Sequence, residues 1–308
     1  MRCVFPQASS SKFDSDPDLL PGAPAHALPR FALSLAQRSF SSLVSVFAPG
    51  ECALCSSSLL EARLAPLCEL CLDKLKPAKL LQCVVCGEAL GMESVWAHGE
   101  DAQIACSICR LSPPPFARAT SFGLYEGALR QMIHLLKFQG QTALADILGD
   151  HLATALEALR SDAPTEMLVL SVPLFRSKRP FNQSTLLANR AVAQVKRRHP
   201  AWKLREDHTL LRRVRPTQSQ FQLSPRQRRL NLGGAFSVTR PGKIAGRDIL
   251  LIDDIYTTGA TARECSKTLL AAGARSVHVL TLARAQQGQV AERWQPGTPL
   301  HTTQFGSA

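Results

Sequence analysis

Residues 249–261 restrict the fold of this chain more than any other feature of its sequence. The apolar run at 249–252 is followed by Asp253 and Asp254, and then Thr-Thr-Gly-Ala-Thr at 257–261 leads into a helical pattern. Ligands of open α/β sheets bind in the crevice beyond the carboxyl ends of the strands. The sequence therefore predicts an inner strand whose end brings two carboxylates and a hydroxyl-rich loop to such a crevice.

The side chains of this segment suit a phosphorylated ribose. Carboxylates accept hydrogen bonds from the vicinal hydroxyls of the sugar. A glycine lets the backbone approach an anion closely, threonine hydroxyls add donors, and the amino end of a helix is electropositive. We interpret the following residues as the ribose and phosphate site: Asp253, Asp254, Thr257, Thr258, Gly259, Ala260 and Thr261. An acid at a strand end or a threonine cap is common in many folds, so the interpretation depends on the order of the whole segment.

Strand and helix patterns alternate along residues 116–285. Short apolar runs predict strands at 119–125, 167–172, 210–214, 249–252 and 276–282. Apolar residues at helical spacing predict helices at 127–138, 142–159, 183–198 and 260–272, the last closed by Gly273. This alternation predicts an α/β fold with a mostly parallel sheet flanked by helices.

Eight of the ten cysteines form four Cys-x-x-Cys pairs, which are Cys52 and Cys55, Cys68 and Cys71, Cys83 and Cys86, and Cys106 and Cys109. Each pair supplies two thiolates about 2.3 Å from a zinc ion, so two pairs complete a tetrahedral site. Four pairs predict a double zinc ribbon with two structural Zn²⁺ sites, because four thiolates leave no open position for catalysis. We expect sequential pairing, and cross-bracing of the first and third pairs is the alternative. A redox dithiol or an iron–sulfur cluster fits eight evenly paired thiols less well.

Composition and pattern divide the chain into four parts. We expect a disordered tail and docking helix at 1–48, the double zinc ribbon at 49–112, the α/β domain at 116–285 and a flexible tail at 286–308. No run approaches the length of about 20 apolar residues that spans a bilayer, so we expect no membrane insertion. Asp14, Asp16 and Asp18 lie where a secretory signal needs an apolar core, and the cytoplasm is the expected location.

Basic residues are concentrated in one part of the sequence. Lys and Arg total 36 against 24 acidic residues, and between Ser171 and Arg247 the only acids are Glu206 and Asp207. Such a block attracts phosphates or polyanions. A solvated basic surface without a ligand is the alternative, because basic surfaces are common.

The segment at 249–261 resembles the phosphoribosyl pyrophosphate motif of type I phosphoribosyltransferases. The chain from about residue 44 to 285 resembles the ComF family of competence-associated proteins, whose domain is amidophosphoribosyltransferase-like. Besides the cysteine pairs, the resemblance includes Lys137, the run VPLFRSKRPFNQS at 172–184, and a spaced set made of Arg213, Thr217, Gln220, Leu223, Arg228, Asn231, Ala235 and Phe236.

The resemblance implies roles for these residues. Asp253 and Asp254 would hold the ribose and act as the catalytic residues, and the loop at 257–261 would hold the 5-phosphate. Pyrophosphate, as a complex with Mg²⁺, would contact Ser177, Lys178, Arg179 and Arg228, and a mobile loop at 215–231 would close over the substrate. One departure bears on the pyrophosphate loop: where the family has a glycine, this chain has Pro180, which restricts the backbone and removes an N–H donor.

The resemblance implies that the chain binds phosphoribosyl pyrophosphate and transfers the phosphoribosyl group to an unidentified acceptor, in DNA uptake or in purine and nucleotide metabolism. No residue of the sequence identifies the acceptor, and fold alone does not assign one. The alternative is a non-catalytic accessory factor that binds single-stranded DNA or DNA-uptake proteins. Aromatic residues make up only 6% of the chain, which is few for a groove that stacks bases.

Overall fold

The computed structural model describes residues 50–59, 67–77, 81–90, 104–175, 181–216, 227 and 231–286. The expectations for residues 1–48 and 287–308 lie outside these residues. None of the helices in the described ranges combines the length and hydrophobicity needed to span a bilayer.

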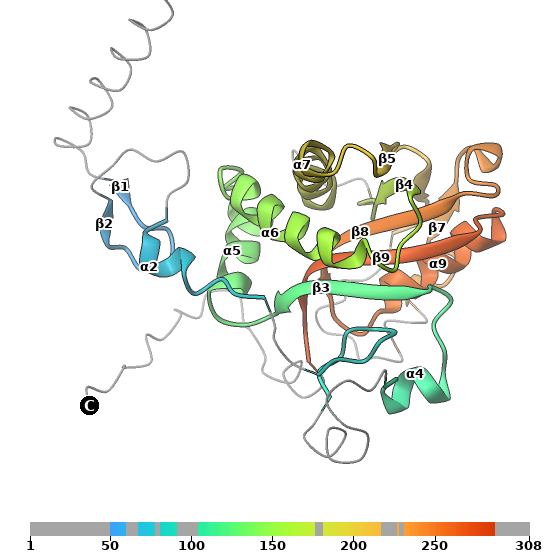
Figure 1. The fold of residues 1–308 in the computed structure, drawn as a ribbon, viewed down its shortest axis with the longest axis horizontal. Coiled ribbons are helices and arrows are strands. Elements are labelled where there is room, and N and C mark those ends of the chain that lie inside the picture. Colours follow the sequence, from blue (N-terminus) through green and yellow to red (C-terminus); the bar gives the residue numbers. More distant parts are fainter. Residues whose placement is uncertain are drawn as a thin grey trace, which may run out of the picture.

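A five-stranded parallel sheet forms the centre of the molecule (Figure 1). Its strands are β3 (Arg118–Leu124), β4 (Glu166–Ser171), β5 (Lys203–Glu206), β8 (Asp248–Tyr256) and β9 (Ser276–Arg284). Their order across the sheet is β3, β9, β8, β4, β5, and every neighbouring pair is parallel. The predicted α/β fold class is therefore confirmed.

Helices cover both faces of this sheet, and each face has its own core. The helices are α5 (Gly127–Gln139), α6 (Leu144–Leu159), α7 (Gln183–Arg198) and α9 (Ala260–Ala271). Residues of α5, α6 and α7 pack with Leu250 and Ile252 of β8, whereas α9 packs with Ile249 and Leu251 of the same strand. Alternate residues of β8 thus enter different cores, which explains why its sequence is a continuous apolar run.

Local signals fix the boundaries of these helices. The side chain of Asn182 caps α7 by accepting a hydrogen bond from the amide of Ser184 at 3.0 Å. Gly140 ends α5 in the left-handed conformation, with φ of 67°. The helices predicted at 127–138, 142–159, 183–198 and 260–272 are confirmed within two residues at each end.

Three features of the strands differ from the prediction. β8 extends to Tyr256 and pairs with β9 as far as Arg284, so Asp253 and Asp254 lie within the strand and not after it. The edge strand β5 was not predicted. Only one of its four residues is buried, in the order exposed, buried, exposed, exposed. The predicted strand at 210–214 forms β6 (Leu211–Arg213) and pairs antiparallel with β7 (Phe236–Val238) outside the central sheet, next to the short 3₁₀ helix η2 (Pro241–Lys243).

The cysteine-rich part adds only short elements, which are β1 (Gly50–Glu51), β2 (Ser58–Leu59), α2 (Glu69–Leu72) and α4 (Ser107–Leu111). Cys52 and Cys71 are buried in the core that contains α5, α6 and α7. Cys83, Cys86 and Cys109 are buried in the other core, with α9. In Figure 1, β1, β2 and α2 lie beside α5, and α4 lies below β3. The domain boundaries remain predictions.

Candidate functional site

The loop between β8 and α9 is the centre of the candidate site. Gly259 has a φ of +73°, in the left-handed region that favours glycine. A Cβ atom at this position would lie 2.1 Å from the Tyr256 hydroxyl oxygen, so no larger residue fits. Tyr256 is buried beneath the loop. The sequence thus folds here into a tight turn that only glycine permits, and this turn leads directly into α9.

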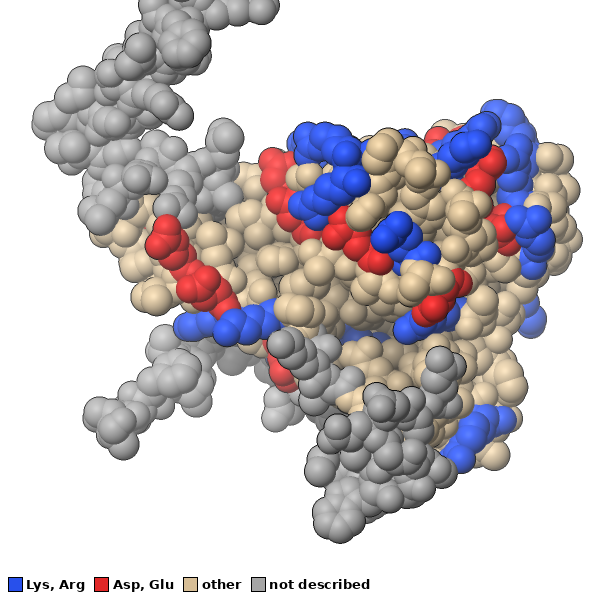
Figure 2. Space-filling view, viewed as in Figure 1, with Lys and Arg blue, Asp and Glu red and all other residues tan. Residues whose placement is uncertain are grey.

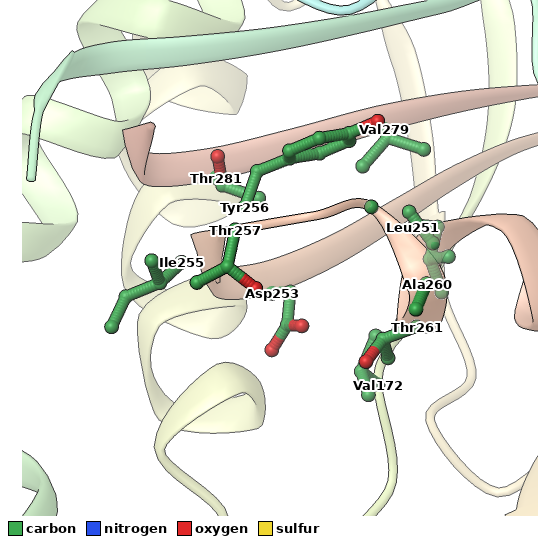
Figure 3. Close-up of a pocket in the computed structure, with 12 residues that line it drawn as sticks. Val172, Leu251, Asp253, Ile255, Tyr256, Thr257, Ala260, Thr261, Val279 and Thr281 are labelled. Carbon is green, nitrogen blue, oxygen red and sulfur yellow. The ribbon is translucent and has the colours of Figure 1, made fainter. Parts of the chain in front are cut away.

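A small cavity opens at this loop, and Figure 3 shows its lining. Its polar side chains belong to Asp253, Tyr256, Thr257, Thr261 and Thr281, and the backbone of Gly259 and Ala260 completes one wall. Thr258 is not part of the lining: its hydroxyl oxygen is buried and, in the described ranges, has no hydrogen-bond partner. Four of the five loop residues predicted from the sequence therefore meet at one cavity.

The two acids of β8 do not share this cavity. Asp253 lines it and accepts a hydrogen bond from the Ser184 hydroxyl at 3.1 Å. Asp254 is only 4% exposed, and its carboxylate forms an ion pair with Lys137 at 2.6 Å and a hydrogen bond with Gln183 at 3.3 Å. Successive residues of a strand point to opposite faces, so the continuation of β8 through both acids separates their side chains.

The pKa values of the two acids move in opposite directions. Burial and the neighbouring charge of Asp254 raise the pKa of Asp253 to about 7. Burial alone would raise the pKa of Asp254 as well, but the charge and hydrogen bond of Lys137 outweigh it and lower this pKa. The pair therefore holds one firmly ionised carboxylate, Asp254, and one carboxyl group at the cavity that changes its charge near neutral pH.

Strand order places a second loop beside the cavity. The chain passes from β4 to β5 on one side and continues from β8 to β9 on the other, so the order reverses between the neighbouring strands β4 and β8. Ligands of open α/β sheets bind at such a switch point. Val172, directly after β4, lines the cavity. The predicted pyrophosphate residues Ser177, Lys178, Arg179 and Arg228 lie outside the described residues.

Three neighbours of the acids belong to segments that carry the family resemblance, but no function was predicted for them: Lys137, Gln183 and Ser184. Lys137 lies four residues after the buried Ile133, on the apolar face of α5, and a lone lysine on such a face was the available signal. Gln183 and Ser184 form the first turn of α7, and both are buried. No periodic pattern connects these residues to β8, because the contacts join separate elements.

The eight paired cysteines form two groups of four. Cys52, Cys55, Cys68 and Cys71 make the first group, and Cys83, Cys86, Cys106 and Cys109 make the second. Within each group all sulfur atoms lie within 4.8 Å of one another. The predicted sequential pairing is therefore confirmed, and the cross-braced alternative is wrong.

The geometry of both groups fits a zinc ion. The Sγ atoms of Cys55 and Cys68 are 3.6 Å apart, and those of Cys86 and Cys106 are 3.7 Å apart. In a tetrahedral zinc site with Zn–S bonds of about 2.3 Å, neighbouring sulfurs lie about 3.8 Å apart. Backbone amides also donate to the sulfurs, from Cys68 to Cys52 at 3.4 Å and from Cys106 to Cys83 at 3.2 Å. Such bonds stabilise thiolate ligands.

We expect two zinc ions per chain of the purified protein. Each group offers four sulfur ligands and no open position, so both ions would be structural. Elemental analysis of protein purified without chelator would measure the ratio. One zinc ion or none per chain would contradict the assignment of both groups.

Several basic residues of the span 171–247 form ion pairs within the fold. Ion pairs join Lys196 to Glu206 at 3.2 Å, Arg198 to Glu157 at 3.3 Å and Arg240 to Asp207 at 3.1 Å. Figure 2 shows blue and red surfaces side by side around α7 and β5. On the face that Figure 2 shows, the basic residues are therefore interspersed with acidic ones.

Comparisons with known proteins relate the chain to proteins named for DNA utilization and competence. No protein-family model matches the chain. The chain is 32% identical over 243 residues to the DNA utilization protein YhgH of Escherichia coli strain K12, which covers 77% of this chain and 97% of that protein. It is 30% identical to Competence protein F of Haemophilus influenzae, over 58% of this chain and 78% of that protein. Competence protein ComFC of Bacillus subtilis is 26% identical, over 71% of this chain and 84% of that protein.

A crystal structure of a hypoxanthine phosphoribosyltransferase from Staphylococcus aureus also matches, with 18% identity and a TM-score of 0.29. The match covers 45% of this chain and 64% of that one, less than two thirds, and a TM-score this low adds no weight. The parallel sheet flanked by helices and the two four-cysteine groups define an α/β protein with an amino-terminal cysteine module. The chain belongs to the ComF family, with YhgH and Competence protein F.

Proposed function

We propose that this protein binds phosphoribosyl pyrophosphate at the β8–α9 loop and transfers the phosphoribosyl group to an acceptor during the uptake or use of DNA. The observation that carries the proposal is the turn at Gly259, which lies between the carboxyl group of Asp253 and the first turn of α9. The names of the relatives supply the connection to DNA and competence.

The 5-phosphate would bind where the loop enters α9. The first four amides of an α-helix have no partner within the helix, and the helix dipole makes this end electropositive. The hydroxyls of Thr257 and Thr261 reach the same side of the loop as Asp253 (Figure 3). The cavity volume is about 20 Å³, which is room for one water-sized group, so the sugar phosphate would lie across its mouth.

Asp253 would accept hydrogen bonds from the ribose hydroxyls, and Asp254 would fix the end of β8 through Lys137. Pyrophosphate, which would arrive with Mg²⁺, would bind Ser177, Lys178 and Arg179, which follow β4 in the sequence, and Arg228. In the transfer, the bond from the anomeric carbon to pyrophosphate breaks and its electrons leave with pyrophosphate. The acceptor forms the new bond and loses a proton. Asp253 would stabilise the positive charge that develops on the sugar.

Binding of single-stranded DNA without transfer is the second candidate, because the relatives are named for DNA utilization and competence. Binding that depends on phosphate contacts weakens steeply as salt rises. The internal ion pairs around α7 reduce the number of basic side chains available for such contacts.

Release of pyrophosphate from labelled phosphoribosyl pyrophosphate tests the proposal directly. The assay would screen bases, amines and single-stranded DNA as acceptors. Release that depends on one acceptor class, and that is lost in Asp253→Asn, is the expected result. Binding of DNA with a steep salt dependence, without any release, would favour the second candidate.

We expect the affinity for ribose 5-phosphate to rise between pH 6 and pH 8. The pKa of Asp253 is raised to about 7, and only the ionised carboxylate accepts hydrogen bonds from both sugar hydroxyls. Below this pKa the affinity should fall by up to about tenfold per pH unit. The raised pKa of Asp253 affects folding stability in the opposite direction to ligand affinity. Its contribution to the free energy of unfolding is present at acidic pH and is lost as pH rises through about 7.

Calorimetry at several pH values would measure this dependence. Asp253→Asn is the control, because any binding that it retains depends on pH only through the ligand phosphate, whose pKa is about 6. The same pH profile in wild type and Asp253→Asn would contradict the role of Asp253.

A further inference from the structure

Arg284 is a buried cation that the functions assigned so far leave unused. It is the last residue of β9, lies opposite Tyr256 of β8 in the sheet, and is 4% exposed. A buried guanidinium group is costly unless its charge is compensated and its donors are bonded. Its partners therefore show what the side chain does.

One side of Arg284 contacts the second four-cysteine group. Its Nη2 atom lies 3.7 Å from the Sγ atom of Cys86 and forms an ion pair with the buried carboxylate of Glu88. Backbone bonds hold the same turn against the sheet, from Ala119 to Val85 at 2.8 Å and from Ala89 to the side chain of Gln286 at 3.0 Å.

The other side of Arg284 contacts the start of the β8–α9 loop. Its Nη1 atom donates a hydrogen bond to the carbonyl oxygen of Thr257 at 2.6 Å. Its guanidinium carbon lies 4.1 Å from the centre of the Tyr256 ring, whose hydroxyl supports Gly259. One side chain thus joins a predicted zinc ligand to both residues that shape the loop.

We propose that a metal ion in the second four-cysteine group positions the β8–α9 loop through Arg284. Four thiolates around one Zn²⁺ carry a net charge of −2, so loading this group places the strongest nearby negative charge beside the guanidinium. That charge holds Arg284 in place, and Arg284 in turn holds the Thr257 carbonyl and the Tyr256 ring. The effect on ligand affinity rests on the proposed phosphate site, whereas the effect on the loop itself does not.

The first four-cysteine group has a different environment. Cys52 and the residues around it share a cavity with the turn between α5 and α6, at Gly140, Gln141 and Thr142. In Figure 1, α2, which contains Cys71, lies beside α5, whereas α4, which contains Cys109, lies below β3. The contacts of Arg284 therefore connect the second group to the β8–α9 loop, where the ligand is proposed to bind.

Coupling between two sites typically amounts to about 5- to 150-fold in affinity. Arg284→Met should keep two zinc ions per chain, accelerate hydrogen exchange of the amides at 257–261 by at least about tenfold, and weaken binding of ribose 5-phosphate within that range. Cys106→Ser removes a ligand of the same metal site, and no described bond joins Cys106 to Arg284. This variant should accelerate exchange in the same amides. Arg275→Met is the control, because Arg275 pairs with Asp248 at the opposite end of β8.

The experiment uses the full chain loaded with zinc, elemental analysis, hydrogen exchange measured by mass spectrometry, and calorimetry with ribose 5-phosphate. An unchanged exchange rate of the loop amides in either Arg284→Met or Cys106→Ser would overturn the proposal. Equal acceleration in Arg275→Met would overturn it too, because the effect would then be general. Should the wild type not bind ribose 5-phosphate, the proposed function would fail, and the exchange rates would still decide whether the metal positions the loop.

Discussion

Replacing Lys137 by Met should destabilise the fold by about 3–5 kcal/mol, the usual cost of leaving one partner of a buried ion pair without compensation. Asp254 is 4% exposed and its pKa is lowered, so the carboxylate stays charged in the folded protein. Lys137 lies 2.6 Å from it, and Gln183 provides only a neutral hydrogen bond at 3.3 Å. Urea denaturation of both proteins would measure the difference.

Two further variants separate this effect from a general loss of charge. Lys196→Met removes an exposed ion pair with Glu206 and should cost at most about 1 kcal/mol. Lys137→Met combined with Asp254→Asn should recover much of the lost stability, because no uncompensated charge remains. A cost for Lys137→Met no larger than that for Lys196→Met would show that the pair is not buried in solution.

Gly259→Ala should weaken the binding of ribose 5-phosphate by about 30-fold or more. The left-handed backbone costs a non-glycine residue about 1–2 kcal/mol, and overpacking against a buried side chain costs about 1–3 kcal/mol more. The added Cβ would lie 2.1 Å from the Tyr256 hydroxyl, so the loop must leave its present conformation. Each 1.4 kcal/mol corresponds to about a tenfold change in affinity.

Two other glycines serve as matched controls for Gly259→Ala. Gly246 also has a positive φ, of +70°, but nothing lies within 4 Å of its added Cβ, so Gly246→Ala tests backbone strain alone. Gly242 has neither feature. Calorimetry on the three variants should show a large loss of affinity only for Gly259→Ala. Comparable affinity in all three would mean that this turn does not bind the phosphate.

The elements that the sequence predicted well are those with strong local signals. The helix α7 was predicted with its observed bounds, because an asparagine cap precedes it and its apolar spacing is regular. The core of β8 is a continuous apolar run, as expected for a strand buried on both faces. β5 carries one buried residue, Leu204, and becomes a strand only through its pairing with β4. Nothing local distinguishes it from a loop.

The site was predicted in part for the same reason. Gly259 and the threonines around it form a local motif, and its place at a strand end followed from the pattern. The separation of Asp253 from Asp254 depends on how far β8 pairs with β9, which is a tertiary property. The lysine that pairs with Asp254 lies 117 residues away in the chain, so spacing could not identify it.

Cysteine spacing predicted which residues group together but not where the groups lie. Two Cys-x-x-Cys pairs separated by a short segment form one site because the turns and the segment between them are local. The burial of one group with α5 and of the other with α9 follows from the folding of the whole chain. The contact from Cys86 to Arg284 spans 198 residues and was outside the reach of any motif.

Calorimetry with phosphoribosyl pyrophosphate and Mg²⁺ tests the central claim most directly, namely that the end of β8 and the following loop bind a phosphorylated ribose. We predict measurable binding by the wild type, and its loss in both Asp253→Asn and Asp254→Asn, the first because a ribose contact is removed and the second because the end of β8 loses its ion pair with Lys137. Equal heats for the wild type and both variants, or no binding by a folded, zinc-loaded wild type, would contradict the claim.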